Sequence, residues 1–125
     1  MAEKKKILFI DDEEAFVTMV KMNLEEAGPY EVRTETRGTR ALAVIQEFKP
    51  DMVFLDVIMP DISGSDVLTE IKDHVQTHKI PVVFLTAIIT EQDVEGTSAV
   101  IGGREFLAKP ISTESLIACI KQHLG

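Results

Sequence analysis

Three short segments of the chain are apolar at every position: residues 7–10, 52–55 and 82–85. A strand with one face in water alternates apolar and polar residues, whereas a parallel strand covered on both faces is apolar throughout. These segments are therefore predicted to be buried parallel strands. Residues 30–35 alternate in the manner of an edge strand, and residues 105–108 make a short last strand.

Four segments that follow predicted strands have the spacing of amphipathic helices. Ser63 and Ser112 stand where the N-caps of the last two are expected, and Gly28-Pro29 ends the first. The apolar positions are Phe16, Val20, Leu24 and Ala27, then Leu42, Ile45 and Phe48, then Val67, Leu68, Ile71 and Val75, and finally Leu116, Ile117, Ile120 and Leu124.

Residues 90–101 carry a weaker apolar stripe. Thr90 and Asp93 have the spacing of a capping box, but Gly96 and its polar neighbours interrupt the apolar positions. We expect a short, mobile helix in this segment.

Strands and helices therefore alternate along the chain as five strand–helix units. Alternating elements of this length predict an α/β fold, in which a doubly wound parallel sheet is covered by helices on both faces. Five strands suit the flavodoxin-like strand order 2-1-3-4-5. No internal repeat, low-complexity tract or linker is visible, so residues 1–125 are expected to form one domain.

The overall charge and the cysteine content narrow the possible functions. The chain has 125 residues and a formal net charge of −8, which disfavours direct binding to nucleic acid because phosphates would be repelled. Cys119 is the one cysteine, so no internal disulfide can form, in keeping with a reducing compartment. No apolar stretch approaches the roughly 20 residues of a membrane helix, and residues 1–6 do not open a secretory signal. We expect a cytoplasmic protein without membrane contact.

Polar side chains stand at the carboxyl ends of four predicted strands, where ligands bind in open α/β sheets. Asp11 and Asp12 follow the first strand, Asp56 the third, Thr86 the fourth and Lys109 the fifth. Each by itself has a structural explanation. An acid or a threonine at this place often caps the following helix, and a lysine before a proline is usually a solvated loop residue. Asp56 is harder to explain in this way, because it ends a buried central strand where an unpaired charge is costly.

Asp11, Asp12 and Asp56 together predict a concentrated negative patch. Mg²⁺ suits such a patch, since it prefers oxygen ligands, uses few carboxylates and keeps several waters. Glu13 and Glu14 are expected to serve the positive end of the following helix, with either Asp12 or Glu13 as its N-cap. A carboxylate beside Mg²⁺, with a lysine and a threonine nearby, suits phosphoryl transfer in which the carboxylate is the nucleophile.

Four motifs extend this interpretation to a family: IDDE at 10–13, FLDVIMPDISG at 54–64, VVFLTA at 82–87 and FLAKPI at 106–111. In this order and spacing they resemble the response-regulator receiver domain of two-component signalling, in its single-domain, chemotaxis-regulator-like form. The resemblance covers essentially the whole chain. It implies that Asp56 accepts a phosphoryl group from a phosphohistidine on a sensor histidine kinase or phosphotransfer protein.

The same resemblance implies a Mg²⁺ site. Asp12, Asp56 and the backbone carbonyl of Ile58 would bind Mg²⁺ directly, and Asp11 would act mainly through a water on the ion. Lys109 would pair with a phosphoryl oxygen. Catalysis would be limited to the domain's own phosphoryl transfer and dephosphorylation, without turnover of an external substrate.

The resemblance also implies a conformational switch. Thr86 would hydrogen-bond another phosphoryl oxygen, Phe106 would move inward with it, and the peptide bond before Pro110 would be cis. The output surface would comprise the fourth helix, expected over 90–101, with the fifth strand at 105–108 and the fifth helix. This surface would control an unknown downstream protein, and such a domain is expected to be a monomer or weak dimer.

Three positions depart from the common pattern of the family. Ile58 and Ile88 stand two residues beyond Asp56 and Thr86, where the family often has polar residues that position the hydrolytic water. Apolar side chains there predict slow loss of the phosphoryl group. Phe106 lacks the hydroxyl of the common tyrosine, so packing alone must select between its two positions.

Three other functions compete with this interpretation. A flavodoxin-type electron carrier needs a hydroxyl- and glycine-rich loop to cradle a phosphate, but residues 11–15 are DDEEA. A carboxylate-nucleophile phosphatase needs a second acid two residues after the nucleophile, where this chain has Ile58. The alternative that stays open is a receiver-like protein-interaction module that works without phosphorylation.

Overall fold

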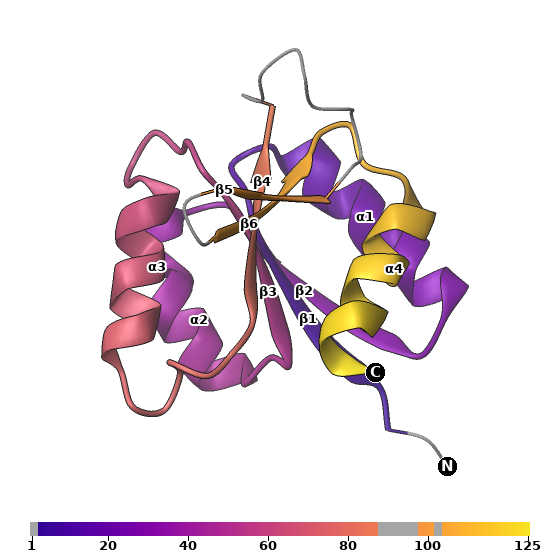
Figure 1. Cartoon of the computed structure of the whole chain (residues 1–125), viewed down its shortest axis with the longest axis horizontal. Coiled ribbons are helices and arrows are strands. Elements are labelled where there is room, and N and C mark those ends of the chain that lie inside the picture. The colour runs from indigo at the N-terminus through magenta and orange to yellow at the C-terminus, as the bar shows by residue number, and fades with distance from the viewer. Residues whose placement is uncertain (1–2, 88–97, 102–103) are drawn as a thin grey trace.

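The structure is a computed structural model that describes residues 3–87, 98–101 and 104–125. Strands and helices alternate along most of the chain (Figure 1). The elements in chain order are β1 (Lys5–Ile10), α1 (Glu14–Ala27), β2 (Tyr30–Glu35), the 3-10 helix η1 (Gly38–Arg40), α2 (Ala41–Phe48), β3 (Met52–Asp56), α3 (Gly64–Asp73), β4 (Val82–Thr86), β5 (Ser98–Ile101), β6 (Arg104–Ala108) and α4 (Thr113–Leu124).

Among the described residues, six strands form one sheet in the order β2-β1-β3-β4-β6-β5. The pairs from β2 to β6 are parallel, and β5 pairs antiparallel with β6. When the five parallel strands are numbered among themselves, they have the predicted order 2-1-3-4-5, so the doubly wound α/β fold is confirmed. Inside the sheet, Phe9 of β1 stacks on Phe54 of β3 with ring centroids 4.7 Å apart.

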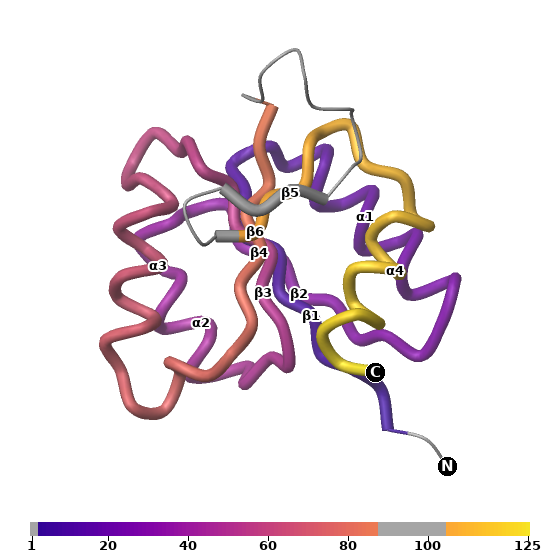
Figure 2. Tube along the Cα trace, in the orientation of Figure 1, coloured from indigo at the N-terminus to yellow at the C-terminus, as the bar shows by residue number. Residues whose placement is uncertain are grey.

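The sheet carries a hydrophobic core on each face, which explains the uninterrupted apolar runs. Helices α1 and α4 cover one face, and α2 and α3 cover the other (Figure 1 and Figure 2). Alternate residues of β1 enter the two cores. Ile7 and Phe9 pack with α1 and α4, whereas Leu8 and Ile10 pack with α2 and α3. All four are fully buried, so a polar side chain at any of them would be costly.

The predicted helix starts at Ser63 and Ser112 are confirmed. Ser63 Oγ accepts a hydrogen bond from the Asp66 backbone N–H at 3.2 Å, and Ser112 Oγ accepts one from the Ser115 N–H at 3.1 Å. Each serine thereby satisfies an N–H group that the first helical turn leaves without a partner in the helix.

The prediction of a helix over residues 90–101 is wrong for its last part. Ser98–Ile101 is strand β5, which pairs with β6. Its segment SAVI contains two β-branched residues and is followed by Gly102-Gly103, a two-residue sequence typical of hairpins. Pairing with β6 therefore outweighed a weak helical stripe. The rest of the expected helix, residues 90–97, lies outside the described residues.

The prediction that Val75 faces inward on the third helix is also wrong, because α3 ends at Asp73 and Val75 is 84% exposed. The Thr77 hydroxyl donates to the Ile71 carbonyl at 2.6 Å. The Thr77 side chain thus occupies the Ile71 carbonyl, which would accept a backbone N–H if the helix continued. Hydrogen bonds of this kind compete with the helix and help to end it.

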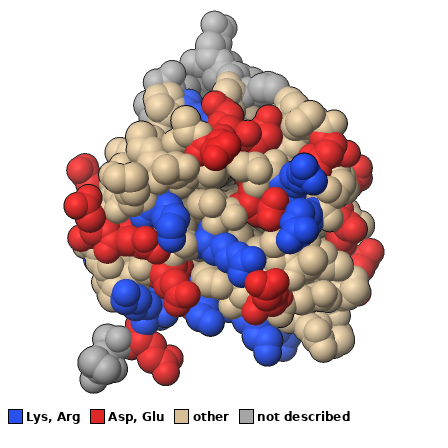
Figure 3. All heavy atoms as spheres, turned by 180° about the vertical axis from the view of Figure 1, so that it is seen from behind, with Lys and Arg blue, Asp and Glu red and all other residues tan. Residues whose placement is uncertain are grey.

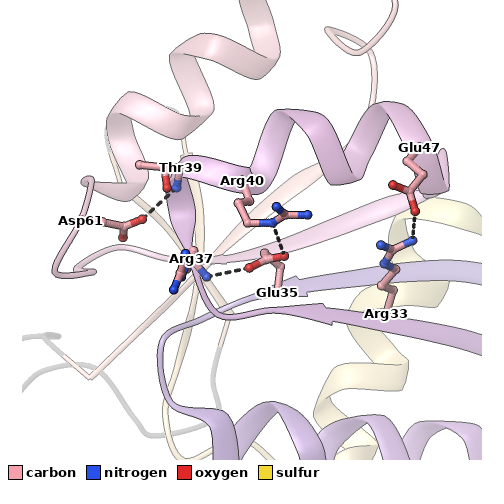
Figure 4. Close-up of polar contacts among 7 residues, drawn as sticks. All are labelled: Arg33, Glu35, Arg37, Thr39, Arg40, Glu47 and Asp61. Carbon is pink, nitrogen blue, oxygen red and sulfur yellow. Dashed lines mark hydrogen bonds and ion pairs between the residues drawn. The ribbon is translucent and has the colours of Figure 1, made fainter.

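Charged side chains of both signs are interspersed over the face shown in Figure 3. Ion pairs tie β2 to the elements that follow it: Arg33 Nη1 lies 2.7 Å from Glu47 Oε1, and Arg40 Nε lies 3.3 Å from Glu35 Oε1 (Figure 4). Exposed pairs of this kind contribute roughly 0–1 kcal/mol each. In the part of the chain that the structure describes, none of the helices combines the length and the apolar character needed to cross a membrane.

Candidate functional site

The carboxyl ends of β1, β3, β4 and β6 meet at one edge of the sheet, and predicted site residues lie there. Asp11 follows β1, Asp56 ends β3, Thr86 ends β4 and Lys109 follows β6. The Lys109 N–H donates to the Thr86 carbonyl at 2.9 Å, so the parallel register continues past the strands and positions both residues. The Lys109–Pro110 peptide bond is cis, as the resemblance implies.

Three carboxylates form the predicted negative patch at this edge. Asp11, Asp12 and Asp56 each offer an oxygen, and these oxygens lie within 4.8 Å of one another. Asp11 is fully buried and Asp56 nearly so, while Asp12 is exposed. Two carboxylates about 4 Å apart repel by about 4 kcal/mol at an effective dielectric constant near 20. The patch therefore needs either positive charge or a bound proton.

Asp11 also contributes to the start of α1. Glu13 occupies the N-cap position, but its side chain makes no capping hydrogen bond. Instead, Asp11 Oδ1 accepts a hydrogen bond from the Glu13 N–H at 2.9 Å. The N-cap is thus at one of the two predicted positions, Asp12 or Glu13, whereas the carboxylate that takes up the backbone N–H belongs to Asp11.

Lys109 supplies a fixed positive charge. Its Nζ lies 2.5 Å from Asp11 Oδ2, 2.7 Å from Glu13 Oε1 and 4.6 Å from the centre of the Phe16 ring. Burial by itself would lower the pKa of Lys109, but the hydrogen bonds and charges of Asp11 and Glu13 outweigh it and raise that pKa above its ordinary value. The ammonium group therefore stays charged at neutral pH.

Sequence reasoning missed the contribution of Glu13 and Phe16 to this site. The sequence predicts that Glu13 serves the dipole or the N-cap of the helix, and Glu13 is also a direct partner of Lys109. Phe16 is predicted as an apolar position of the helix, and its ring also lies within cation–π distance of the ammonium. Glu13 is the N-cap of α1 and Phe16 lies in its first turn, but Lys109 is 96 residues from Glu13 in the chain.

Burial and mutual repulsion set the protonation of the acids. The pKa of Asp56 is raised to about 7, first by burial and then by the charge of Asp11, while Lys109 opposes the shift. Burial also raises the pKa of Asp11, although its contacts with Lys109 and the Glu13 N–H counteract the effect. Near neutral pH, the site therefore favours either a proton on Asp56 or a further cation beside it.

The donor atoms of the site fit Mg²⁺. Each of the three acids offers carboxylate oxygen, the ligand that hard divalent ions prefer. Asp11 Oδ2 is buried and, apart from its ion pair with Lys109, has no hydrogen-bond partner among the described residues. A divalent cation within this cluster would relieve the repulsion between the three carboxylates.

The loop after β3 requires glycine at position 64. The Gly64 N–H donates to the Val57 carbonyl at 2.8 Å, and a Cβ on Gly64 would overlap the Asp56 backbone oxygen and lie 2.9 Å from Val57 Cα. Further along the loop, Asp61 Oδ2 accepts a hydrogen bond from the Thr39 N–H at 2.9 Å (Figure 4). That hydrogen bond lowers the pKa of Asp61. One hydrogen bond thus joins the two ends of the loop, and another ties its middle to η1.

The remaining predicted residues differ in exposure. Thr86 is buried at the end of β4. Phe106 is half-buried on β6 and stacks on Phe84 of β4, with ring centroids 5.2 Å apart. The Ile58 residue is 58% exposed. Ile88, the other apolar position that departs from the family pattern, lies outside the described residues.

Comparison with known proteins gives the same family throughout. The model of the response regulator receiver domain matches residues 7–121. The polar-differentiation response regulator DivK of Brucella anthropi is 33% identical over 122 residues, which cover 97% of both chains. The phosphate regulon transcriptional regulatory protein PhoB of Rhizobium meliloti is 35% identical over 120 residues, which cover 95% of this chain and 52% of that protein. The chain thus spans about half of PhoB and nearly all of DivK.

Solved structures share the arrangement of strands and helices. A putative response regulator from Chloroflexus aurantiacus has a TM-score of 0.82 at 30% identity and covers 98% of both chains. The chemotaxis response regulator CheY4 of Vibrio cholerae has a TM-score of 0.79 at 30% identity and covers 97% of this chain and 99% of its own. The chain therefore belongs to the response regulator receiver domain family, the phosphorylation-controlled signalling modules of two-component systems.

Proposed function

We propose that this protein is a phosphorylation-switched signalling domain. Asp56 would accept a phosphoryl group from the phosphohistidine of a sensor histidine kinase or a phosphotransfer protein, in a reaction that depends on Mg²⁺. The observation behind this proposal is the environment of Asp56, a nearly buried carboxylate with a pKa of about 7. Two further acids and the Lys109 ammonium lie in the same site. Nearby positive charge favours the ionised form of Asp56, and an ionised carboxylate is suited to act as a nucleophile.

In the transfer, a carboxylate oxygen of Asp56 attacks phosphorus, an O–P bond forms, and the N–P bond of the donor phosphohistidine breaks. The electron pair of the broken bond returns to the imidazole nitrogen. Lys109 would move from its partner Asp11 to a phosphoryl oxygen. When bound, Mg²⁺ supplies positive charge to the phosphoryl oxygens. Its ligands would be Asp12, Asp56 and the Ile58 carbonyl, and Asp11 would act mainly through a water.

Thr86 and Phe106 would couple the transfer to a change of surface. The phosphoryl group adds about −1.5 to −2 charge and new acceptor oxygens, to one of which the Thr86 hydroxyl would donate. Phe106, half-buried beside Phe84, would move further inward with Thr86. The described part of the output surface is β6 and α4, and the remainder of the expected fourth helix lies outside the described residues. A downstream protein would bind this surface in one of its two states.

Catalysis would be limited to this transfer and to the hydrolysis that reverses it. Ile58 offers no polar side chain to position the hydrolytic water, so loss of the phosphoryl group would be slow. The proposal further includes one receiver domain over residues 1–125, located in the cytoplasm, monomeric or weakly dimeric, and without direct contact to nucleic acid or membranes. A fused output domain and a separate partner both fit it, because the match covers half of PhoB and nearly all of DivK.

The proposal is tested by intact mass after incubation with Mg²⁺ and a small acyl phosphate, for the wild type, Asp56→Asn and Asp73→Asn. Asp73 is an exposed acid at the end of α3 and is the matched control. We expect one added phosphoryl group in the wild type and the control and none in Asp56→Asn. Equal labelling of Asp56→Asn would overturn the proposal. No adduct in any variant, with Mg²⁺ binding shown separately, would favour the receiver-like interaction module that works without phosphorylation.

A further inference from the structure

A second cluster of potential metal ligands lies on β6 and α4. Glu105 stands near the amino end of β6, whereas Lys109 follows the carboxyl end of that strand. Cys119 and His123 are on α4, four residues apart and therefore on one face of the helix. One ligand atom from each of Glu105, Cys119 and His123 lies within 4.8 Å of the other two. We refer to these three residues as the β6–α4 cluster.

The three side chains of the β6–α4 cluster contact one another directly. His123 Nε2 lies 2.8 Å from Glu105 Oε1, and because a carboxylate only accepts, this nitrogen carries a proton. The Cys119 thiol donates to Glu105 Oε2 at 3.6 Å. Cys119 is 4% exposed, and the side chains of His123 and Glu105 are 26% and 15% exposed. The cluster is thus assembled around one carboxylate, with Cys119 buried and His123 at the surface.

We propose that the β6–α4 cluster binds Zn²⁺ through Cys119 Sγ, His123 Nε2 and one carboxylate oxygen of Glu105. Tetrahedral Zn²⁺, with bonds of about 2.3 Å to sulfur and about 2.0–2.2 Å to nitrogen and oxygen, holds its ligand atoms roughly 3.3–3.7 Å apart. The donors of the cluster are already close to this spacing, at 2.8 Å and 3.6 Å for the two hydrogen-bonded pairs.

The kind of donor selects the ion. Thiolate and imidazole favour Zn²⁺ over Mg²⁺ and Ca²⁺, whose preferred ligands are oxygens. The Cys119 thiolate and the Glu105 carboxylate together neutralise the two positive charges of Zn²⁺, so little net charge is buried. Binding breaks the S–H bond and releases that proton to the buffer, and it moves the imidazole proton of His123 from Nε2 to Nδ1.

The Cys119 thiol must lose its proton to bind an ion. Burial, followed by the charge of Glu105, raises the pKa of Cys119 to about 12, so little thiolate is present to react with oxidants. A coordinating thiol is deprotonated by the ion itself. The neighbouring carboxylate, which disfavours a free thiolate, becomes a further ligand once the ion is bound.

A groove leads from the surface to two of the ligands. It has a volume of about 300 Å³ and is lined by Glu105 and His123, by Lys72 of α3 and by Phe84 of β4, among others. Three protein ligands leave one tetrahedral position for water or a small ligand, as in sites that are not purely structural. The groove gives the ion and that fourth ligand a route to the cluster.

Zn²⁺ at this place would link α4 to β6. Glu105 is the neighbour of Phe106 in β6, and both elements belong to the output surface proposed above. The ion would therefore restrain the surface that a partner protein contacts. This consequence rests on the proposed function, whereas the metal site itself does not depend on phosphorylation.

The first test is a Co²⁺ titration of the full wild-type chain, kept reduced with a phosphine, with Mg²⁺ in excess to occupy the acidic site. A thiolate bound to Co²⁺ gives a sulfur-to-metal charge-transfer band in the near ultraviolet, which oxygen ligands do not give. We expect this band to saturate at one Co²⁺ per chain and to disappear on addition of Zn²⁺. Binding without the band, or no binding, would overturn the proposal.

The second test measures Zn²⁺ affinity by calorimetry under the same conditions. Cys119→Ser and His123→Gln should each weaken binding at least tenfold. His74→Gln, which changes an exposed histidine beyond the end of α3, is the matched control and should leave the affinity unchanged. Equal affinity in all four proteins would also overturn the proposal. If a variant fails to fold, the wild-type cobalt spectrum still decides the question.

Discussion

The acidic site and the β6–α4 cluster show two outcomes of the same physical effect. Burial raises the pKa of Asp56 to about 7 and that of Cys119 to about 12. Asp56 has the Lys109 ammonium in its site, which opposes the shift, whereas the partner of the Cys119 thiol is the Glu105 carboxylate. Burial and a neighbouring carboxylate raise both pKa values, but they start from different ordinary values, 3.8 for the carboxyl and 9.0 for the thiol. One group can therefore ionise near neutral pH and the other cannot.

The two regions also differ in the ion that each would hold. The acidic site offers carboxylate oxygens, which suit a hard ion such as Mg²⁺. The β6–α4 cluster offers sulfur, nitrogen and oxygen, which suit Zn²⁺. With such different donors, the two proposed ions would not compete for one site.

The largest effect is expected for the reactivity of Cys119. At pH 8, a thiol with a pKa of about 12 is ionised in roughly one molecule in ten thousand, and an ordinary thiol in about one in four. Iodoacetamide should therefore modify the native protein about a thousandfold more slowly than an exposed thiol, as followed by mass spectrometry.

The control for this reaction moves the cysteine to an exposed position of the same helix, by combining Cys119→Ser with Gln122→Cys. Unfolded wild type should react as fast as this control. If native wild type and the control react at the same rate, burial does not suppress the ionisation of the Cys119 thiol. The contrast between Cys119 and Asp56 would then be wrong.

The second effect concerns the loop that frames the acidic site. Gly64→Ala should lower the free energy of unfolding by about 2–3 kcal/mol, because the added Cβ meets backbone atoms of Asp56 and its neighbour. Gly38→Ala is the matched control and should cost about 1 kcal/mol, since its Cβ meets the side chains of Ile62 and Met59. Urea unfolding measures both. Equal losses would show that the backbone around Asp56 yields as readily as a side chain.

The third effect is a pH-dependent stability difference at Asp56. Its pKa is about 7 in the folded chain and has the ordinary value of 3.8 in the unfolded chain. Between these values the native state binds more protons, so without divalent ions the free energy of unfolding falls as pH rises from about 4 to about 7. Asp56→Asn removes this loss and should exceed the wild type by about 1–2 kcal/mol at pH 8, and by little at pH 4.5.

Urea unfolding in the presence of a chelator measures this difference, with Asp73→Asn as the control that should match the wild type at both pH values. Added Mg²⁺ should bring the wild type closer to Asp56→Asn at pH 8. A variant no more stable than the wild type at pH 8 would mean that burial does not destabilise the Asp56 carboxylate.

The smallest effect is expected at Ile58. Ile58→Asn places an amide two residues beyond Asp56 and should speed loss of the phosphoryl group by roughly threefold to tenfold, up to about 1.4 kcal/mol in the barrier. Val75→Asn makes the same kind of change at an exposed apolar residue after α3 and should leave the rate unchanged. The decay of the added mass gives both rates. A slower or unchanged decay in Ile58→Asn would contradict the role assigned to this position.

The sequence predicted the helices and strands that depend on neighbouring residues. It failed where contacts outside the local pattern set the end of a helix or the type of an element. The apolar runs at 7–10 and 52–55 became buried parallel strands, and Ser63 caps its helix as expected. Val75 continues the helical spacing of α3, but the Thr77 hydroxyl binds a carbonyl of the last turn and the helix ends before it. In the same way, Ser98–Ile101 became a strand because β6 was available to pair with it.

The sequence by itself determined the edge of the sheet at which Asp11, Asp56, Thr86 and Lys109 gather, because parallel strands place their carboxyl ends together. Only the tertiary structure decided the partners of these groups. Glu13 reaches Lys109 across 96 residues, and Glu105 meets Cys119 and His123 because α4 packs beside β6. Periodicity shows which face of an element is buried, whereas contacts between side chains depend on how two elements pack, which no local pattern records.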